Sequence, residues 1–173
     1  MKKMLMLVLP VALVGCTLSS DFNLALSNPT IATDTYFMNG AVKTYVACDN
    51  DPNGTQVVIG VNATGSLKEA NFWISGSERY NTFTRHTVKN TDTNAKFENN
   101  WYRAQFTVTT AGIVRTPFAS MQEKQVWIAD PSKASGNFVG MIEGVAPSGA
   151  RTGHAKTSQI SAYDNCQFTA PNS

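Results

Sequence analysis

The sequence predicts an all-β fold, an antiparallel β-sandwich of about seven or eight strands held by one disulfide. Short runs rich in Val, Ile, Thr and aromatic residues recur between clusters of Gly, Asn, Asp, Ser and Pro, as strands do between turns. No segment keeps a helical apolar period for three turns, and the chain has no internal repeat. With 42% hydrophobic and 10% aromatic residues, the composition is that of a globular domain.

The chain begins with a short positive segment followed by an apolar run. Lys2 and Lys3 come first, and the uncharged, mostly apolar residues 4–14 follow. This run is too short to cross a bilayer core, which needs about 20 residues, but it suits the central region of a signal peptide. The N-terminus therefore predicts an exported protein.

The end of this segment, Leu13-Val14-Gly15-Cys16, resembles the lipobox of bacterial lipoproteins. The resemblance implies a signal peptide of residues 1–15 and a mature protein that begins at Cys16. Diacylglycerol and a further acyl chain, such as palmitate, would anchor that cysteine in a membrane. Among lipoproteins of two-membrane bacteria, Asp after the cysteine favours the inner membrane, so Thr17 favours the outer one. The alternative is an ordinary signal peptide or short N-terminal anchor, with Cys16 a plain thiol.

Cleavage changes the charge of the protein. The full chain has 14 Lys and Arg against 12 Asp and Glu, and the loss of Lys2 and Lys3 leaves the mature side chains balanced. The remaining basic residues are scattered, whereas nucleic-acid binding depends on clustered cations that neutralise phosphates. We therefore expect no nucleic-acid partner.

Residues 16–35 are polar, small and poor in charge, and they are predicted to be a lipidated tether. An edge strand containing Phe22, Leu24 and Leu26 is the alternative for this segment. The sandwich domain is expected over residues 36–173, with a topology that is either jelly-roll or immunoglobulin-like. Its expected strands are 42–48, 56–62, 70–75, 82–88, 102–110, 123–129, 138–145 and 158–168.

Lipidation of Cys16 leaves two cysteines, Cys48 and Cys166. An exported protein meets an oxidising compartment, so a disulfide between them is expected. Cys48 shares the apolar phase of its strand with Val46, and Cys166 shares that of the last strand with Phe168. Neither cysteine lies in a Cys-x-x-Cys pair, so a metal or redox role has little support.

The run DNDPNG at residues 49–54 resembles the opening of a calcium-binding loop. An EF-hand has Glu at its twelfth position, where this chain has Gly60, so a site would need a carboxylate from elsewhere. The disulfide would bring one from near Cys166. The candidate calcium ligands are therefore Asp49, Asp51, Asn53 and Asp164. The alternative is a polar hairpin turn, because Asp, Asn, Pro and Gly are the usual turn residues.

All three tryptophans fall on the more polar phase of their predicted strands. Trp73 alternates with Ile74, Trp101 precedes Tyr102, and Trp127 lies between Val126 and Ile128. Exposed aromatic residues among polar ones suit sugar rings, peptides or a protein partner. The candidate ligand-binding residues are Trp73, Trp101 and Trp127. The alternative is that these strands are covered on both faces, which would make the tryptophans structural.

Catalytic motifs are absent from the sequence. His86 and His154 are the only histidines and stand far apart, without zinc-ligand spacing. There is no Gly-x-Ser-x-Gly elbow, phosphate loop or dinucleotide fingerprint. A hydrolase would need one of these histidines in a concave pocket beside a nucleophile or a carboxylate. We therefore do not expect an enzyme.

Together these features favour a non-enzymatic binding module, or an accessory subunit of a surface assembly, held at the cell envelope by its lipid. Its expected partners are the membrane and either an envelope protein complex or a surface glycan. A calcium-dependent carbohydrate- or peptide-binding module and a secreted hydrolase are the alternatives.

Overall fold

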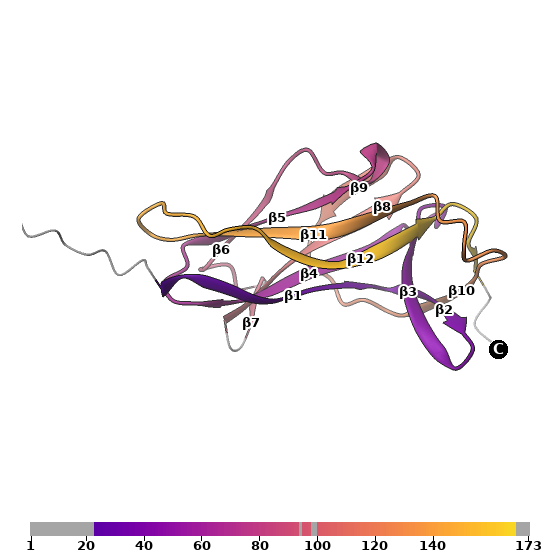
Figure 1. Ribbon diagram of the computed structural model, residues 1–173, viewed down its shortest axis with the longest axis horizontal. Coiled ribbons are helices and arrows are strands. Elements are labelled where there is room, and N and C mark those ends of the chain that lie inside the picture. The colour runs from indigo at the N-terminus through magenta and orange to yellow at the C-terminus, as the bar shows by residue number, and fades with distance from the viewer. Residues whose placement is uncertain (1–22, 94, 98–99, 169–173) are drawn as a thin grey trace, which may run out of the picture.

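The computed structural model describes residues 23–93, 95–97 and 100–168, so the predicted signal peptide, Cys16 and Phe22 lie outside the described residues. Within these ranges the chain is a β-sandwich of two sheets, and the all-β prediction is confirmed (Figure 1). One turn of 3-10 helix, η2 (Glu78–Tyr80), follows the fifth strand. The described part of the chain contains no helix with the length and apolar character needed to cross a membrane.

The smaller sheet has five strands in the order β1-β4-β8-β7, with β9 also paired to β8. All of its pairs are antiparallel. Its strands are β1 (Ala25–Thr33), β4 (Thr55–Thr64), β7 (Lys96–Phe97), β8 (Trp101–Thr109) and β9 (Gly112–Thr116).

The larger sheet has eight strands in the order β13-β10-β2-β3-β12-β11-β5-β6. Two of its pairs, β10 with β2 and β12 with β3, depart from the antiparallel pattern and are parallel. The hairpin of β2 and β3 thus lies between two strands from the C-terminal part of the chain. Its strands are β2 (Thr35–Asn39), β3 (Val42–Cys48), β5 (Glu69–Gly76), β6 (His86–Lys89), β10 (Lys124–Trp127), β11 (Gly136–Val145), β12 (Ala155–Tyr163) and β13 (Gln167–Phe168).

The predicted strand 42–48 is β3 with the same bounds, whereas two other predictions need correction. The strand predicted at 82–88 begins only at His86, because Thr82 and Asn81 bond back to β5. The Thr82 hydroxyl accepts a hydrogen bond from the backbone N–H of Ile74, and the Asn81 amide oxygen accepts one from Gly76. The segment predicted as one strand at 158–168 is divided between β12 and β13.

The predicted tether, residues 16–35, is too long, because residues 25–33 form β1 at the edge of the smaller sheet. Leu24 and Leu26 pack against the core, as the edge-strand alternative requires. The ladder between β1 and β4 shifts register between Ser27 and Thr30, where Asn28 has a positive φ of 50°. β1 runs along the sandwich and leads directly into the hairpin of β2 and β3, which projects at the opposite end (Figure 1).

The buried apolar residues form two clusters. The main core lies between the sheets and contains the inward phases of β4, β5 and β8, with Phe72, Phe106 and Ile59 among its largest fully buried side chains. Ala47 of β3 belongs to this main core, while its neighbours on the same strand face the other cluster. That second core consists of Phe37, Val46, Cys48, Val126, Ile128, Tyr163 and Cys166.

Candidate functional site

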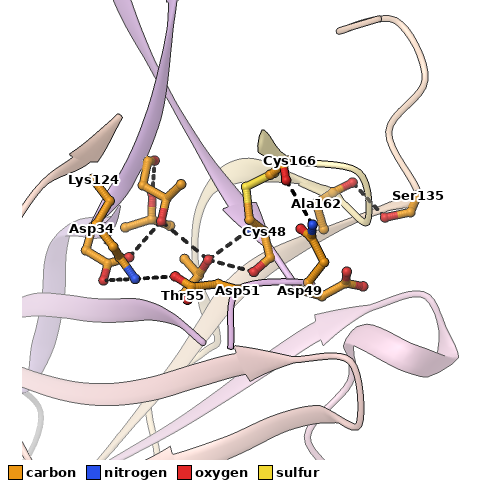
Figure 2. The surroundings of a disulfide bond; sticks show 12 residues. Asp34, Cys48, Asp49, Asp51, Thr55, Lys124, Ser135, Ala162 and Cys166 are labelled. Carbon is orange, nitrogen blue, oxygen red and sulfur yellow. Dashed lines mark hydrogen bonds and ion pairs between the residues drawn. A yellow bond between two sulfur atoms is a disulfide. The ribbon is translucent and has the colours of Figure 1, made fainter. Parts of the chain in front are cut away.

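A disulfide joins Cys48, at the end of β3, to Cys166, just before β13, with the two Cα atoms 5.9 Å apart. The predicted pairing is therefore confirmed. The Asn50 amide donates a hydrogen bond to the Cys166 carbonyl oxygen at 2.9 Å (Figure 2). Because both cysteines are buried in the second core, the bridge fixes β3, β10 and β13 to one another.

Residues 49–54 do not form the hairpin turn that was the alternative to a calcium loop, because they connect β3 of the larger sheet to β4 of the smaller sheet. Asp49 is completely buried. Its Oδ2 accepts a hydrogen bond from the Tyr80 hydroxyl at 2.8 Å and lies 3.0 Å from Nη2 of Arg79. Burial raises the pKa of Tyr80, so the hydroxyl stays protonated and keeps donating.

The second carboxylate of this loop has a different cation. Asp51 forms an ion pair with Lys124, whose Nζ also lies 3.0 Å from Asp34 and donates to the Gly54 carbonyl at 3.1 Å (Figure 2). Burial is the largest influence on the pKa of Lys124 and lowers it, but Asp51 and Asp34 together outweigh burial, and the pKa is raised. Lys124 therefore stays charged and binds two carboxylates that are only 3% and 4% exposed.

The candidate calcium ligands engage protein groups instead of one common centre. Asp49 and Asp51 bind cationic side chains, the backbone N–H of Asn53 donates to Asp51 at 2.8 Å, and Asp164 is exposed. Among residues 23–93, 95–97 and 100–168, no three His, Cys, Asp or Glu side chains are grouped to hold a metal ion. The arrangement thus gives calcium binding no support, because each carboxylate of the loop is paired with a cationic side chain of the protein.

Two of the three tryptophans are partly covered on the outer faces of the sheets. The guanidinium of Arg85 lies 4.4 Å from the ring centre of Trp73, and His154 meets the same ring edge-on at 5.0 Å. Trp101 lies over Gly60, where an added Cβ would come within 2.6 Å of the indole nitrogen. Trp73 and Trp101 are therefore partly covered by neighbouring groups, as expected if these two tryptophans have a structural role.

Trp127 differs, because 53% of its surface is exposed. It lies on β10, second from one edge of the larger sheet, whereas Trp73 lies on β5, second from the other edge. Trp101 belongs to the smaller sheet. The three tryptophans therefore do not form one surface, and Trp127 must be considered with its own neighbours.

Trp127 belongs to a surface on three adjacent strands that we call the aromatic face. Cross-strand pairing places Tyr36 opposite Tyr45 and beside Gln125, and Trp127 follows Gln125 by two residues, which keeps it on the same side. Met38 pairs with Lys43 and continues this side towards the hairpin tip. The aromatic face consists of Tyr36, Met38, Lys43, Tyr45, Gln125 and Trp127.

Tyr36, Tyr45 and Lys43 of the aromatic face are held in place by one another and by Glu123. The rings of Tyr36 and Tyr45 are 6.0 Å apart, and the ammonium of Lys43 lies 4.3 Å from the ring centre of Tyr36. Tyr45 donates to Glu123 at 2.6 Å, and Lys43 forms an ion pair with the same carboxylate. Hydrogen bonds from Lys43 and then Tyr45 lower the pKa of Glu123. The tyrosine part of the aromatic face is thus ordered in advance of any ligand.

Sequence reasoning placed Trp127 on the outward phase but missed Tyr36, Met38 and Tyr45 as its neighbours. The available signal was Asn39-Gly40, because Asn-Gly between two apolar runs indicates a β-hairpin. Gly40 has a φ of +63°, and Asn39 pairs with Val42 across the turn. The parallel pairing that brings β10 beside this hairpin has no local signal.

A second polar cluster, which we call the Glu143 cluster, covers Trp73. The Glu143 side chain is 7% exposed and lies 2.7 Å from Arg85, 3.6 Å from His154 and in an ion pair with Arg151. Burial is the largest influence on the pKa of Glu143 and raises it, but the two arginines outweigh it and the pKa is lowered. Arg151 and His154 lie in the connection between β11 and β12, and Arg85 lies just before β6. Because Glu143 binds all three, the cluster holds that connection against the larger sheet.

The two histidines have different surroundings. His154 is about half exposed in the Glu143 cluster, whereas His86 is 9% exposed and lines a cavity with Asp92. Burial, followed by the charge of Arg115, lowers the pKa of His86 to about 4. A general base works best with a pKa near the operating pH, so His86 is poorly suited to the hydrolase alternative.

Comparison with known proteins yields no match: no family model fits this chain, and neither the curated proteins nor the solved structures include one similar to it at a significant level.

Proposed function

We propose that this chain is a lipid-anchored, non-enzymatic binding module of the cell envelope that holds a partner protein through its aromatic face. The observation that carries the proposal is a group of side chains on adjacent strands, in which Tyr45, Trp127 and Met38 are exposed and Tyr36 is half-buried. Tyr, Trp and Met are the residue types enriched where proteins bind one another.

The support beneath the aromatic face favours a binding role. The second core packs directly behind it, and the disulfide Cys48–Cys166 lies within that core. A surface that is already rigid loses little conformational entropy on binding, so more of the contact energy appears as affinity. A protein partner is favoured over a glycan because Met38, which is 42% exposed, extends the surface with an apolar group that sugar hydroxyls do not match.

Truncating Trp127 is expected to release the partner. We expect Trp127→Ala to weaken binding by about tenfold or more, because a central exposed tryptophan at an interface typically contributes above about 1–2 kcal/mol. The measurement is recovery of the partner with affinity-tagged full-length protein from detergent-solubilised native membranes, followed by titration of the identified partner against purified protein.

The matched control is Phe83→Ala, because Phe83 is 91% exposed but lies in the connection between β5 and β6, away from the aromatic face. This variant should recover the partner as well as the parent does. A parent protein that always purifies alone, or a Trp127→Ala variant that binds as tightly as the parent, would contradict the proposal. Binding of envelope polysaccharide in the absence of protein would replace the partner protein with a glycan.

The anchor is tested separately through Cys16. We expect the mature wild-type protein to be heavier than the polypeptide from Cys16 to Ser173 by the mass of its acyl groups, and to sediment with membranes. Cys16→Ser should lose both properties, because serine has no thiol to receive the diacylglycerol. Intact-mass spectrometry and membrane fractionation measure the two outcomes, and an unmodified wild-type N-terminus would refute lipidation.

A further inference from the structure

A cavity of about 200 Å³ opens between β6 of the larger sheet and β8 and β9 of the smaller one, away from the aromatic face. One water molecule occupies about 30 Å³ in the liquid, so the cavity has room for a group of several heavy atoms. Its polar lining comes from both sheets and from the connection after β6. The lining side chains that bear polar or charged groups are His86, Asp92, Arg103, Gln105, Arg115 and Thr116.

His86 lines this cavity and carries a buried hydrogen-bonding atom that has no partner among the described residues. Its ring is 9% exposed and meets Phe106 edge-on at 6.3 Å, yet its Nδ1 has no hydrogen-bond partner among the described residues. Buried polar side-chain atoms in folded proteins are nearly always paired, because an unpaired one loses its bonds to water without replacement. A ligand group that reached Nδ1 from the cavity would remove that cost.

The charges around the cavity indicate the sign of such a ligand. The described lining residues include two cationic side chains, Arg103 of β8 and Arg115 of β9, and one acidic side chain, Asp92. Arg103 is half-buried, with its guanidinium 3.4 Å from the ring centre of Phe118, and burial lowers its pKa. Hydrogen bonds between a guanidinium and an oxyanion are strong, and more so where water is excluded.

We propose that this cavity binds a small oxyanion, the carboxylate, phosphate or sulfate group of a ligand, with Arg103 and Arg115 as the cationic contacts and His86 as a hydrogen-bond donor. This site is independent of the aromatic face, so either proposal stands without the other. An anion beside His86 would stabilise the imidazolium, opposing the effects of burial and of Arg115 that lower the pKa of His86 to about 4.

The test follows the two histidine resonances by NMR during a pH titration of the full-length protein. Sulfate is the probe, because it remains a dianion throughout, and chloride at equal ionic strength is the reference. We expect sulfate to raise the pKa of His86 by about one unit or more, the effect of an opposite charge in contact. The same shift with trifluoroacetate, a carboxylate that like sulfate stays ionised through the titration, would extend the site to carboxylates, and its absence would restrict the site to tetrahedral oxyanions.

Arg115→Gln is the informative variant, because Arg115 is an exposed residue of the edge strand β9 and its loss should leave the fold intact. The pKa of His86 in chloride should rise in this variant, and its response to sulfate should fall to a small fraction of the parent's. Arg151→Gln, in the Glu143 cluster, is the matched control and should keep the full response. No shift of His86 in the parent, or a sulfate shift confined to His154, would overturn the proposal.

Discussion

Replacing Cys48 and Cys166 together by alanine is expected to lower the free energy of unfolding by about 4–5 kcal/mol, the chain-entropy value for so long a loop. The bridge spans a sequence separation of 118 residues, so without it the unfolded chain gains many conformations. Urea denaturation followed by tryptophan fluorescence measures the change. The dependence of the free energy on urea should also steepen, because the uncrosslinked unfolded chain exposes more surface.

The control for the disulfide is the unsubstituted protein in reductant, which should unfold at nearly the same urea concentration as the double alanine variant. A loss below about 1 kcal/mol would mean that native-state strain cancels the entropic gain of the crosslink. The double variant should also bind the partner more weakly, because the second core lies directly behind the aromatic face.

Lys124→Met is expected to destabilise the fold by about 3–5 kcal/mol, because it leaves two buried carboxylates without their cation. Asp34 and Asp51 are 4% and 3% exposed, and Lys124 is their shared partner. Because the pKa of Lys124 is raised, its contribution to the free energy of unfolding is complete at neutral pH and is lost only as pH rises through that pKa. The two proteins are therefore compared near pH 7. Urea denaturation of both proteins supplies the measurement.

Lys133→Met is the matched control, because Lys133 forms an exposed ion pair with Asp130 at 3.3 Å and should matter by at most about 0.5 kcal/mol. Adding Asp34→Asn and Asp51→Asn to Lys124→Met should restore much of the stability, since the uncompensated charges are then gone. If Lys124→Met were as stable as the Lys133→Met control, the buried charges would have to be protonated or hydrated in the native protein.

The sequence predicts this fold well where patterns are local. The residues on one face of β3 are mostly apolar, and turn-forming residues follow the strand directly. Its bounds are therefore predicted without error. β1 is foreseen only in part, by the alternative of an edge strand with Leu24 and Leu26, because Asn28 and Pro29 interrupt its pattern at the position of the register shift. β2 is short and ends in Met38-Asn39, so it merges with the segment predicted as tether.

The candidate sites depend more on contacts between distant parts of the chain. DNDPNG resembles a calcium loop in isolation, yet the cations that neutralise Asp49 and Asp51 are Arg79 and Lys124, 30 and 73 positions away in the sequence. The outward phase of Trp127 is predictable from Val126 and Ile128. Its proximity to Tyr36 is not, because it depends on a parallel pair between the two ends of the domain.

The course of β1 has a mechanical consequence. This strand leaves the predicted lipid end, runs along the sandwich and enters β2, one residue after its own end (Figure 1). Tension between a membrane anchor and a partner on the aromatic face would therefore pass along β1 into β2, with no need to cross the main core. A strand rises about 3.3 Å per residue and is already near the limit of chain extension, so this connection cannot lengthen without breaking. The domain would then transmit a pull as a short, stiff link between the membrane and the bound protein.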